Sequence, residues 1–110
     1  MTNKELQKEI LSKAIFSREF EKDLYNRIKK GLFKYPIYLS YGQEYIAASL
    51  ACYIKKYSSL NPNIFIQHRG HSTYLSFGGE IDNLIAELLG NYRLSNTKCM
   101  GGSASIIQKK

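Results

Sequence analysis

Apolar residues recur at helical intervals through the first quarter of the chain, and this long pattern limits what the chain can fold into. The recurring residues are Leu6, Ile10, Ala14, Phe16, Phe20, Leu24 and Ile28. Such spacing places side chains on one face of a helix, and the Gly31 that follows is a common helix-ending residue. The pattern predicts one helix up to Lys30, or two helices joined near Ser17, a residue type that caps helices well.

Two later segments repeat the helical pattern. A helix is predicted over residues 44–57, with the following large apolar residues on one face: Ile46, Leu50, Tyr53, Ile54 and Tyr57. The small residues between them would let this helix approach a neighbour closely. Another helix is predicted over residues 81–89, where apolar side chains form an i, i+3, i+4, i+7, i+8 stripe that Gly90 ends.

A short apolar run, Ile64 to Gln67, is typical of a buried strand. It ends directly on a polar loop, residues 68–72, and ligands bind beyond the carboxyl ends of strands in α/β folds. A buried strand needs neighbouring strands to satisfy its backbone hydrogen bonds. The sequence therefore predicts an α/β fold, with the partner strands in sequence that follows these 110 residues.

The chain is basic, with 16 Lys and Arg against nine Asp and Glu and a net charge of +7. Such an excess attracts phosphates, in nucleic acid, at a membrane surface or in a cofactor. The basic residues are dispersed, which favours a solvated surface, although the aromatic residues leave single-stranded nucleic acid as an alternative partner. The prediction is that the chain binds no nucleic acid.

The start of the chain is charged and lacks the apolar core of a secretory signal, and no run approaches the roughly 20 apolar residues of a membrane span. Cys52 and Cys99 lie far apart without metal-ligand spacing and are predicted to be reduced thiols. These features predict a cytoplasmic protein without a membrane segment.

Residues 68–71 are the strongest candidate for phosphate binding. Arg69 offers a planar fork of donors for phosphate oxygens, and the imidazoles of His68 and His71 can donate further hydrogen bonds. Gly70 permits close approach of the backbone to a ligand. An exposed basic loop without a ligand is the alternative.

Two other segments carry weaker signals. Gly42, Gln43 and Glu44 begin the second predicted helix, where a role in starting the helix is sufficient to explain all three. The loop with Gly101, Gly102 and Ser103 could present backbone N–H groups to an anion, or could be a flexible loop.

Five segments in order resemble the α subunit of the thiamine-diphosphate-dependent 2-oxo-acid dehydrogenase E1 component, of the pyruvate and acetoin type. They are residues 18–31 (opening helix), residues 42–44 (GQE), residues 64–72 (IFIQHRGHS), residues 86–90 (AELLG) and residues 98–103 (KCMGGS). The resemblance covers most of the chain from Arg18 onwards. It implies that residues 1–110 are the N-terminal portion of one such domain and that residues 1–17 are a helical extension.

The resemblance implies a thiamine-diphosphate-binding fold, a parallel sheet flanked by helices, of which these residues are the helix-rich N-terminal part. It implies that Arg69, with His68 and His71, contacts the diphosphate of the cofactor. It also implies that seven residues shape the site or the subunit contact: Tyr38, Gly42, Gln43, Glu44, Gly101, Gly102 and Ser103. The complete enzyme would decarboxylate a pyruvate-like 2-oxo acid and pass the acyl unit to a lipoyl group.

The partners implied are an E1 β subunit, in an α2β2 assembly, and a lipoyl-bearing E2 component. The Mg²⁺ that joins the diphosphate to the protein is expected to be bound by a downstream segment, because the only aspartates here are Asp23 and Asp82, both in predicted helices. The 110 residues alone are therefore expected to be inactive. A non-catalytic remnant or interaction module of the same family is the alternative.

Several positions depart from the family pattern. His68 stands where the family has tyrosine, Tyr38 where it has histidine, and Ser72 where it has glycine. Ala104 and Ser105 replace a Met-His pair. These changes in imidazole positions indicate a divergent branch that acts on another 2-oxo acid.

Overall fold

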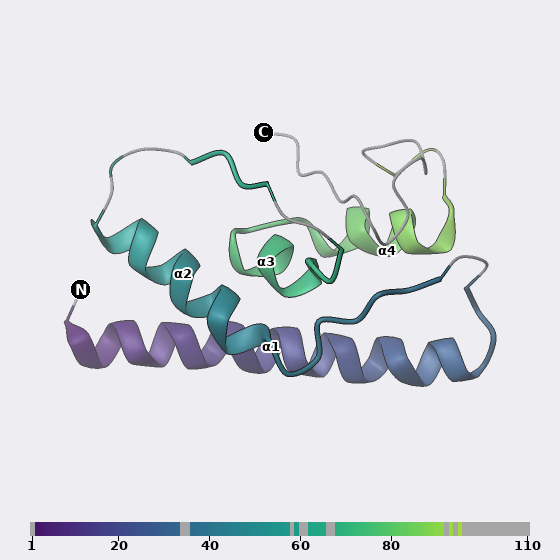
Figure 1. Ribbon diagram of the computed structural model, residues 1–110, viewed down its shortest axis with the longest axis horizontal. Coiled ribbons are helices and arrows are strands. Elements are labelled where there is room, and N and C mark those ends of the chain that lie inside the picture. The colour runs from purple at the N-terminus through teal and green to yellow at the C-terminus, as the bar shows by residue number, and fades with distance from the viewer. Residues whose placement is uncertain are drawn as a thin grey trace.

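One 27-residue helix, α1 (Asn3–Lys29), runs along one side of the molecule in the computed structural model, which describes residues 2–33, 36–57, 59, 62–65, 68–91, 93 and 95 (Figure 1). A capping box starts it: the Glu5 backbone N–H donates to the Thr2 hydroxyl at 3.1 Å, and the Thr2 N–H donates to the Glu5 carboxylate at 2.8 Å. Ser17 lies fully buried in the middle of α1. The prediction of a single helix is therefore confirmed, and Ser17 is not a cap.

Three further helices follow in the described part of the chain: α2 (Glu44–Tyr57), α3 (His71–Ser76) and α4 (Ile81–Leu89). The ranges of α2 and α4 agree with the sequence pattern, and Gly90 ends α4 in the left-handed conformation, with φ of 80°. Helix α3 was not predicted, and its first two residues, His71 and Ser72, fall in the segment interpreted as a polar loop. Among the described residues no helix has the length and apolarity needed to cross a membrane.

Helix α1 packs against all the others through two apolar clusters. In its first half, Leu6, Ile10 and Ala14 contact Ala48 and Cys52 of α2. The small residues of α2 thus allow the close approach predicted from the sequence, and Cys52 is a buried free thiol, as expected.

The second cluster joins the other half of α1 to α3 and α4. Its buried members are Leu24, Tyr74, Leu75, Leu84 and Leu88, surrounded by partly buried apolar residues. Burying a side chain of this size contributes about 1.5–3 kcal/mol, so these few residues supply much of what holds α3 and α4 to α1.

The turn between α3 and α4 is fastened by Tyr74. Its hydroxyl donates to the Glu80 carbonyl at 3.0 Å. Its ring packs against Gly79 so closely that a Cβ added at position 79 would lie 2.3 Å from the nearest ring carbon. Position 79 therefore requires glycine while Tyr74 is present.

The predicted strand is wrong for Ile64 and Phe65, which lie in no regular structure, with Phe65 92% exposed. Ile66 and Gln67 fall outside the described residues. A strand is stable only when a neighbour accepts its hydrogen bonds, and the described part of the chain contains no strand at all. The helix-rich character of the fold class is confirmed, and the described residues show no parallel sheet.

Overpacking the contact between α1 and α2 should destabilise the protein. Ala48 is completely buried there, so Ala48→Leu should lower the free energy of unfolding by about 1–3 kcal/mol, because there is no room for three more carbons. Urea denaturation measures the change. Ser12→Leu, on the exposed side of α1, is the control, and an equal loss in both variants would contradict the packing described here.

Candidate functional site

Two loops far apart in the sequence lie side by side. The Tyr38 and His68 rings have centroids 5.0 Å apart, the Arg69 Nη1 donates to the Leu39 carbonyl at 2.8 Å, and the Ser72 hydroxyl donates to the Ser40 hydroxyl at 2.7 Å. Residues 38, 39 and 40 thus contact residues 68, 69 and 72 in that order, so the two segments run in the same direction. Their contact brings three predicted site residues together: Tyr38, His68 and Arg69, which we call the YHR surface.

The side chains of the YHR surface face solvent. His68 and Arg69 are exposed, and Tyr38 is 36% exposed. The guanidinium of Arg69 has five N–H donors, and among the described residues its one hydrogen-bond acceptor is the Leu39 carbonyl. A planar cation with donors to spare, next to an imidazole, can receive an anionic oxygen.

Arg69 also has an uncommon backbone conformation. Its φ is 71°, the only positive φ of a non-glycine residue in the described part of the chain. This region costs an L-residue about 1–2 kcal/mol. The hydrogen bond from its side chain to Leu39 and the burial of Gly70 and His71 just after it hold the residue in this conformation.

His71, the third predicted phosphate donor, is placed differently. It begins α3, is fully buried, and has its Nδ1 2.9 Å from the Oε1 of Glu21, which is also fully buried. Its ring meets Phe20 edge to face, with centroids 6.5 Å apart. His71 therefore joins α1 to α3 in the interior and does not belong to the exposed YHR surface.

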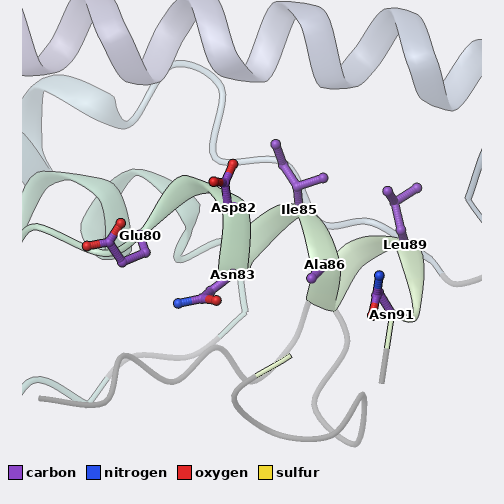
Figure 2. A pocket seen from close by; sticks show the side chains of 7 residues that line it. All are labelled: Glu80, Asp82, Asn83, Ile85, Ala86, Leu89 and Asn91. Atoms are coloured by element: carbon purple, nitrogen blue, oxygen red, sulfur yellow. The ribbon is translucent and has the colours of Figure 1, made fainter. Parts of the chain in front are cut away.

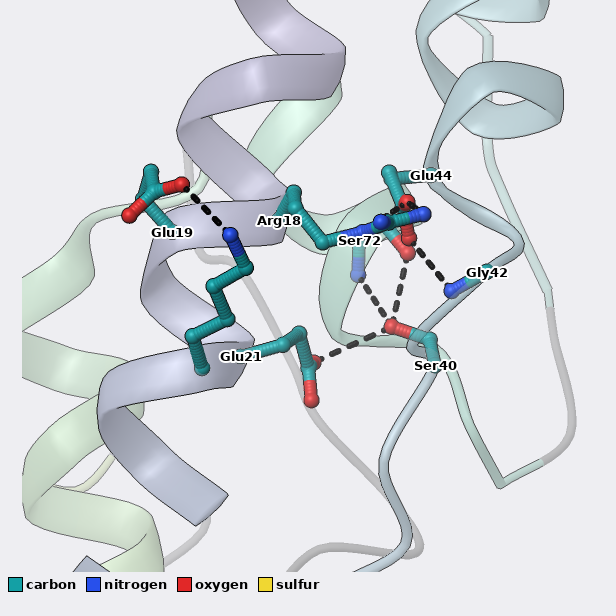
Figure 3. A network of polar contacts seen from close by, with 8 residues as sticks. Arg18, Glu19, Glu21, Ser40, Gly42, Glu44 and Ser72 are labelled. Carbon is teal, nitrogen blue, oxygen red and sulfur yellow. Dashed lines mark hydrogen bonds and ion pairs between the residues drawn. The ribbon is translucent and has the colours of Figure 1, made fainter. Parts of the chain in front are cut away.

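Glu21 belongs to a buried polar network, and Figure 3 shows its contact with Ser40. Its Oε1 also accepts a hydrogen bond from the Ser40 hydroxyl at 3.1 Å, and Ser40 in turn accepts from the Ser72 hydroxyl and backbone N–H. Its Oε2 has no partner among the described residues. The network connects α1, the loop before α2, and α3.

The carboxylate, imidazole and hydroxyls of this network are the groups of a hydrolytic triad, but their arrangement differs. The Ser40 hydroxyl donates to the carboxylate, whereas a nucleophilic serine donates to the imidazole. The side chains of the network are almost completely buried and cannot reach a substrate; they are those of Glu21, Ser40, His71 and Ser72. The network is structural.

Sequence reasoning missed Glu21, although a signal was present. Glu21 falls on the same helical face as Leu6, Ile10, Ala14 and Leu24, and a charge on an otherwise apolar face requires a buried partner. The histidine that supplies it lies 50 residues later, so the pairing could not be found from local spacing.

Gly42, Gln43 and Glu44 form the turn into α2. Gly42 has φ of 94°, and its N–H donates to the Glu44 Oε2 at 2.8 Å, while the Gln43 N–H donates to the Ser40 carbonyl at 2.9 Å. Glu44 is buried and also forms an ion pair with Arg18, whose guanidinium lies 4.2 Å from the Tyr41 ring centroid. These contacts support the role of the three residues in starting the helix.

The charge of Glu44 is stabilised by its surroundings. Burial raises the pKa of its carboxyl, but hydrogen bonds from its own backbone N–H, from Arg18 and from the Gly42 N–H outweigh burial and hold the pKa below its ordinary value. Glu44 is therefore an ionised anchor for Arg18 in the folded protein.

The remaining predicted residues, Gly101, Gly102 and Ser103, lie outside the described residues. A pocket of about 560 Å³ lies along α4 (Figure 2) and includes none of the YHR residues; it is lined by Glu80, Asp82, Asn83, Ile85, Ala86, Leu89 and Asn91. Two carboxylates in this lining disfavour a phosphate there.

Comparison with known proteins finds no relative of this chain. The chain matches no protein-family model, no curated protein and no solved structure. Within the described residues no group of three or more His, Cys, Asp and Glu side chains could hold a metal ion. The candidate site therefore depends on the geometry of the YHR surface.

Removing the partner of Glu21 should be strongly destabilising. His71→Ala leaves a buried carboxyl group without its ring partner, and such changes cost about 3–5 kcal/mol, a large part of the stability of a small domain. Chemical denaturation measures the loss. The matched control is Arg27→Ala, which removes an exposed ion pair to Asp23 and should change stability by less than about 1 kcal/mol. A similar small effect for both variants would show that the buried pair is not a structural link.

The ion pair of Glu44 predicts a pH-dependent contribution to stability. A carboxyl with a lowered pKa in the folded state stabilises it above the ordinary glutamate pKa of about 4.3, and this contribution is lost as the pH falls through the folded-state pKa. Arg18→Gln should therefore lower the melting temperature at pH 7, and the difference from the unsubstituted protein should shrink below about pH 4. Arg27→Gln serves as control, and a constant difference across pH 3–7 for Arg18→Gln would contradict the assignment.

Proposed function

We propose that the chain supplies the diphosphate-facing part of the α subunit of a thiamine-diphosphate-dependent 2-oxo-acid dehydrogenase. The observation that carries the proposal is the YHR surface. His68 and Arg69 stand where the family has a cofactor-contacting Tyr-Arg pair, and Tyr38 stands where it has a histidine near the active site. These positions, 30 residues apart, share one exposed surface.

The residues of the YHR surface fit one end of a diphosphate. Within the described residues only Leu39 accepts a hydrogen bond from the five guanidinium N–H donors of Arg69, and His68 offers a ring nitrogen beside it. His71 is left out of this role because it is buried against Glu21. The ligands of Mg²⁺, and the parallel sheet of the thiamine-diphosphate fold, lie outside the described residues in this proposal.

The activity proposed for the complete enzyme is oxidative decarboxylation of a pyruvate-like 2-oxo acid, in the cytoplasm, with acyl transfer to the lipoyl group of an E2 component. Thiamine diphosphate, when bound, supplies the nucleophilic carbon and the electron sink for decarboxylation. The residues of this chain orient the cofactor through its diphosphate, and a β subunit completes the site in an α2β2 assembly. The 110 residues by themselves are proposed to be inactive.

Binding of pyrophosphate and thiamine diphosphate to the 110-residue chain tests the proposal. In two-dimensional NMR titrations, both ligands should shift the resonances of His68 and Arg69 in a saturable way, and Arg69→Ala should weaken binding about tenfold, because a charge-assisted hydrogen bond contributes about 1.5–3 kcal/mol. Arg93→Ala, at another exposed arginine, should leave binding unchanged.

Two results would contradict the proposal. One is equal weakening by Arg69→Ala and Arg93→Ala, which would indicate unspecific attraction to a basic protein. The other is a shift pattern centred on residues away from the YHR surface.

A further inference from the structure

The hydroxyl of Ser40 uses its full hydrogen-bonding capacity in the interior (Figure 3). A hydroxyl has one O–H donor and two acceptor lone pairs. The Ser40 hydroxyl donates to the Glu21 Oε1 at 3.1 Å, and it accepts from the Ser72 backbone N–H at 3.2 Å and from the Ser72 hydroxyl at 2.7 Å. Ser40 is 1% exposed, so protein groups rather than solvent satisfy it.

One of these hydrogen bonds caps helix α3. The first N–H groups of a helix have no partner inside the helix, and the side chain at the N-cap commonly accepts from one of them. The N-cap of α3 is Gly70, which has no side chain, and the N–H of Ser72, the second residue of the helix, donates to Ser40. A residue 32 positions earlier in the chain therefore supplies the cap.

Ser40 also determines where the Leu39 carbonyl lies. The Leu39 side chain packs against the second apolar cluster, but apolar contacts are non-directional and do not orient a carbonyl group. Hydrogen bonds are directional, and those of Ser40 fix this segment against Glu21 and Ser72. The neighbouring Leu39 carbonyl is thereby held where it accepts from the Arg69 Nη1 at 2.8 Å.

Arg69 requires such a restraint, because its φ of 71° lies in a region that an L-residue disfavours by a factor of about 5–30. Arg69 directly precedes the N-cap of α3, and its side chain is bonded to Leu39. His71 also anchors the start of α3 on Glu21, whereas Ser40 joins α3 to the segment that carries the Leu39 carbonyl.

We infer that Ser40 is a positioning residue of the YHR surface. Its buried hydroxyl holds Arg69 in the conformation that presents the guanidinium to an anionic oxygen, without contacting the ligand. Affinity for the ligand falls in proportion to the fraction of molecules in which Arg69 is correctly placed. The role in binding rests on the proposed function, but the effect of Ser40 on the backbone of Arg69 does not.

Ser40→Ala tests the inference in two measurements on the 110-residue chain. In NMR spectra, the strong NOE between the amide proton and the Hα of Arg69, a signature of positive φ, should weaken to the level of a residue with negative φ. In a titration with pyrophosphate, binding should weaken at least about fivefold, the lower end of the conformational preference at this position. Ser17→Ala is the matched control and should change neither result, because Ser17 is fully buried but its hydroxyl has no hydrogen-bond partner in the described part of the chain.

Two further variants separate positioning from a general loss of stability. Ala48→Leu is expected to destabilise the contact between α1 and α2, and it should leave the NOE and the affinity unchanged. Ser72→Ala removes one of the hydrogen bonds to Ser40 and should give a smaller change in the same direction as Ser40→Ala. It decides the question if circular dichroism shows that Ser40→Ala is unfolded.

An unchanged NOE or an unchanged affinity in Ser40→Ala would overturn the inference. So would equal losses in Ser17→Ala or Ala48→Leu, since Ser40 would then act only through stability. If the unsubstituted chain binds no pyrophosphate, the proposed function fails, and the NOE alone decides whether Ser40 holds the backbone of Arg69.

Discussion

The contact between Glu21 and His71 is the constraint on which the arrangement of the helices depends. A carboxyl group in the interior loses its water and must be compensated by partners, at a cost of several kcal/mol if they are missing. Glu21 lies between the two apolar clusters of α1, and its partners come from the start of α3 and from Ser40. The requirement to satisfy one buried group thus fixes where two later segments must lie against α1.

The exposed YHR surface follows from this buried contact. Ser40 and His71 are held on Glu21, so the residues that precede each of them along the chain are forced into proximity. Leu39 then accepts from Arg69, and Tyr38 meets His68. The interior network does no chemistry itself, but it positions the surface on which the cofactor proposal depends.

The helices α1, α2 and α4 could be predicted because their apolar residues repeat every three to four positions, a signal that is local in the sequence. Helix α3 could not, since it has only six residues and three of its buried side chains, His71, Ser72 and Ser76, are polar. Ile64 and Phe65 show the converse: they belong to a locally strand-like run, but they form no strand, and the described residues contain no strand with which they could pair. The candidate site was found in part, because residue type identified Arg69 and His68, whereas the burial of His71 depends on a partner 50 residues away.

The packing of the Tyr74 ring over Gly79 has a consequence for how this sequence can change over time. A Cβ at position 79 would clash with the Tyr74 ring. A substitution of Gly79 is therefore tolerated only in a chain in which residue 74 has already been replaced by a smaller one. Tyr74 can be replaced first, because glycine at position 79 remains acceptable when the ring is absent. Homologous sequences should therefore contain glycine at 79 wherever they keep an aromatic residue at 74, and the order of the two substitutions along any lineage is fixed.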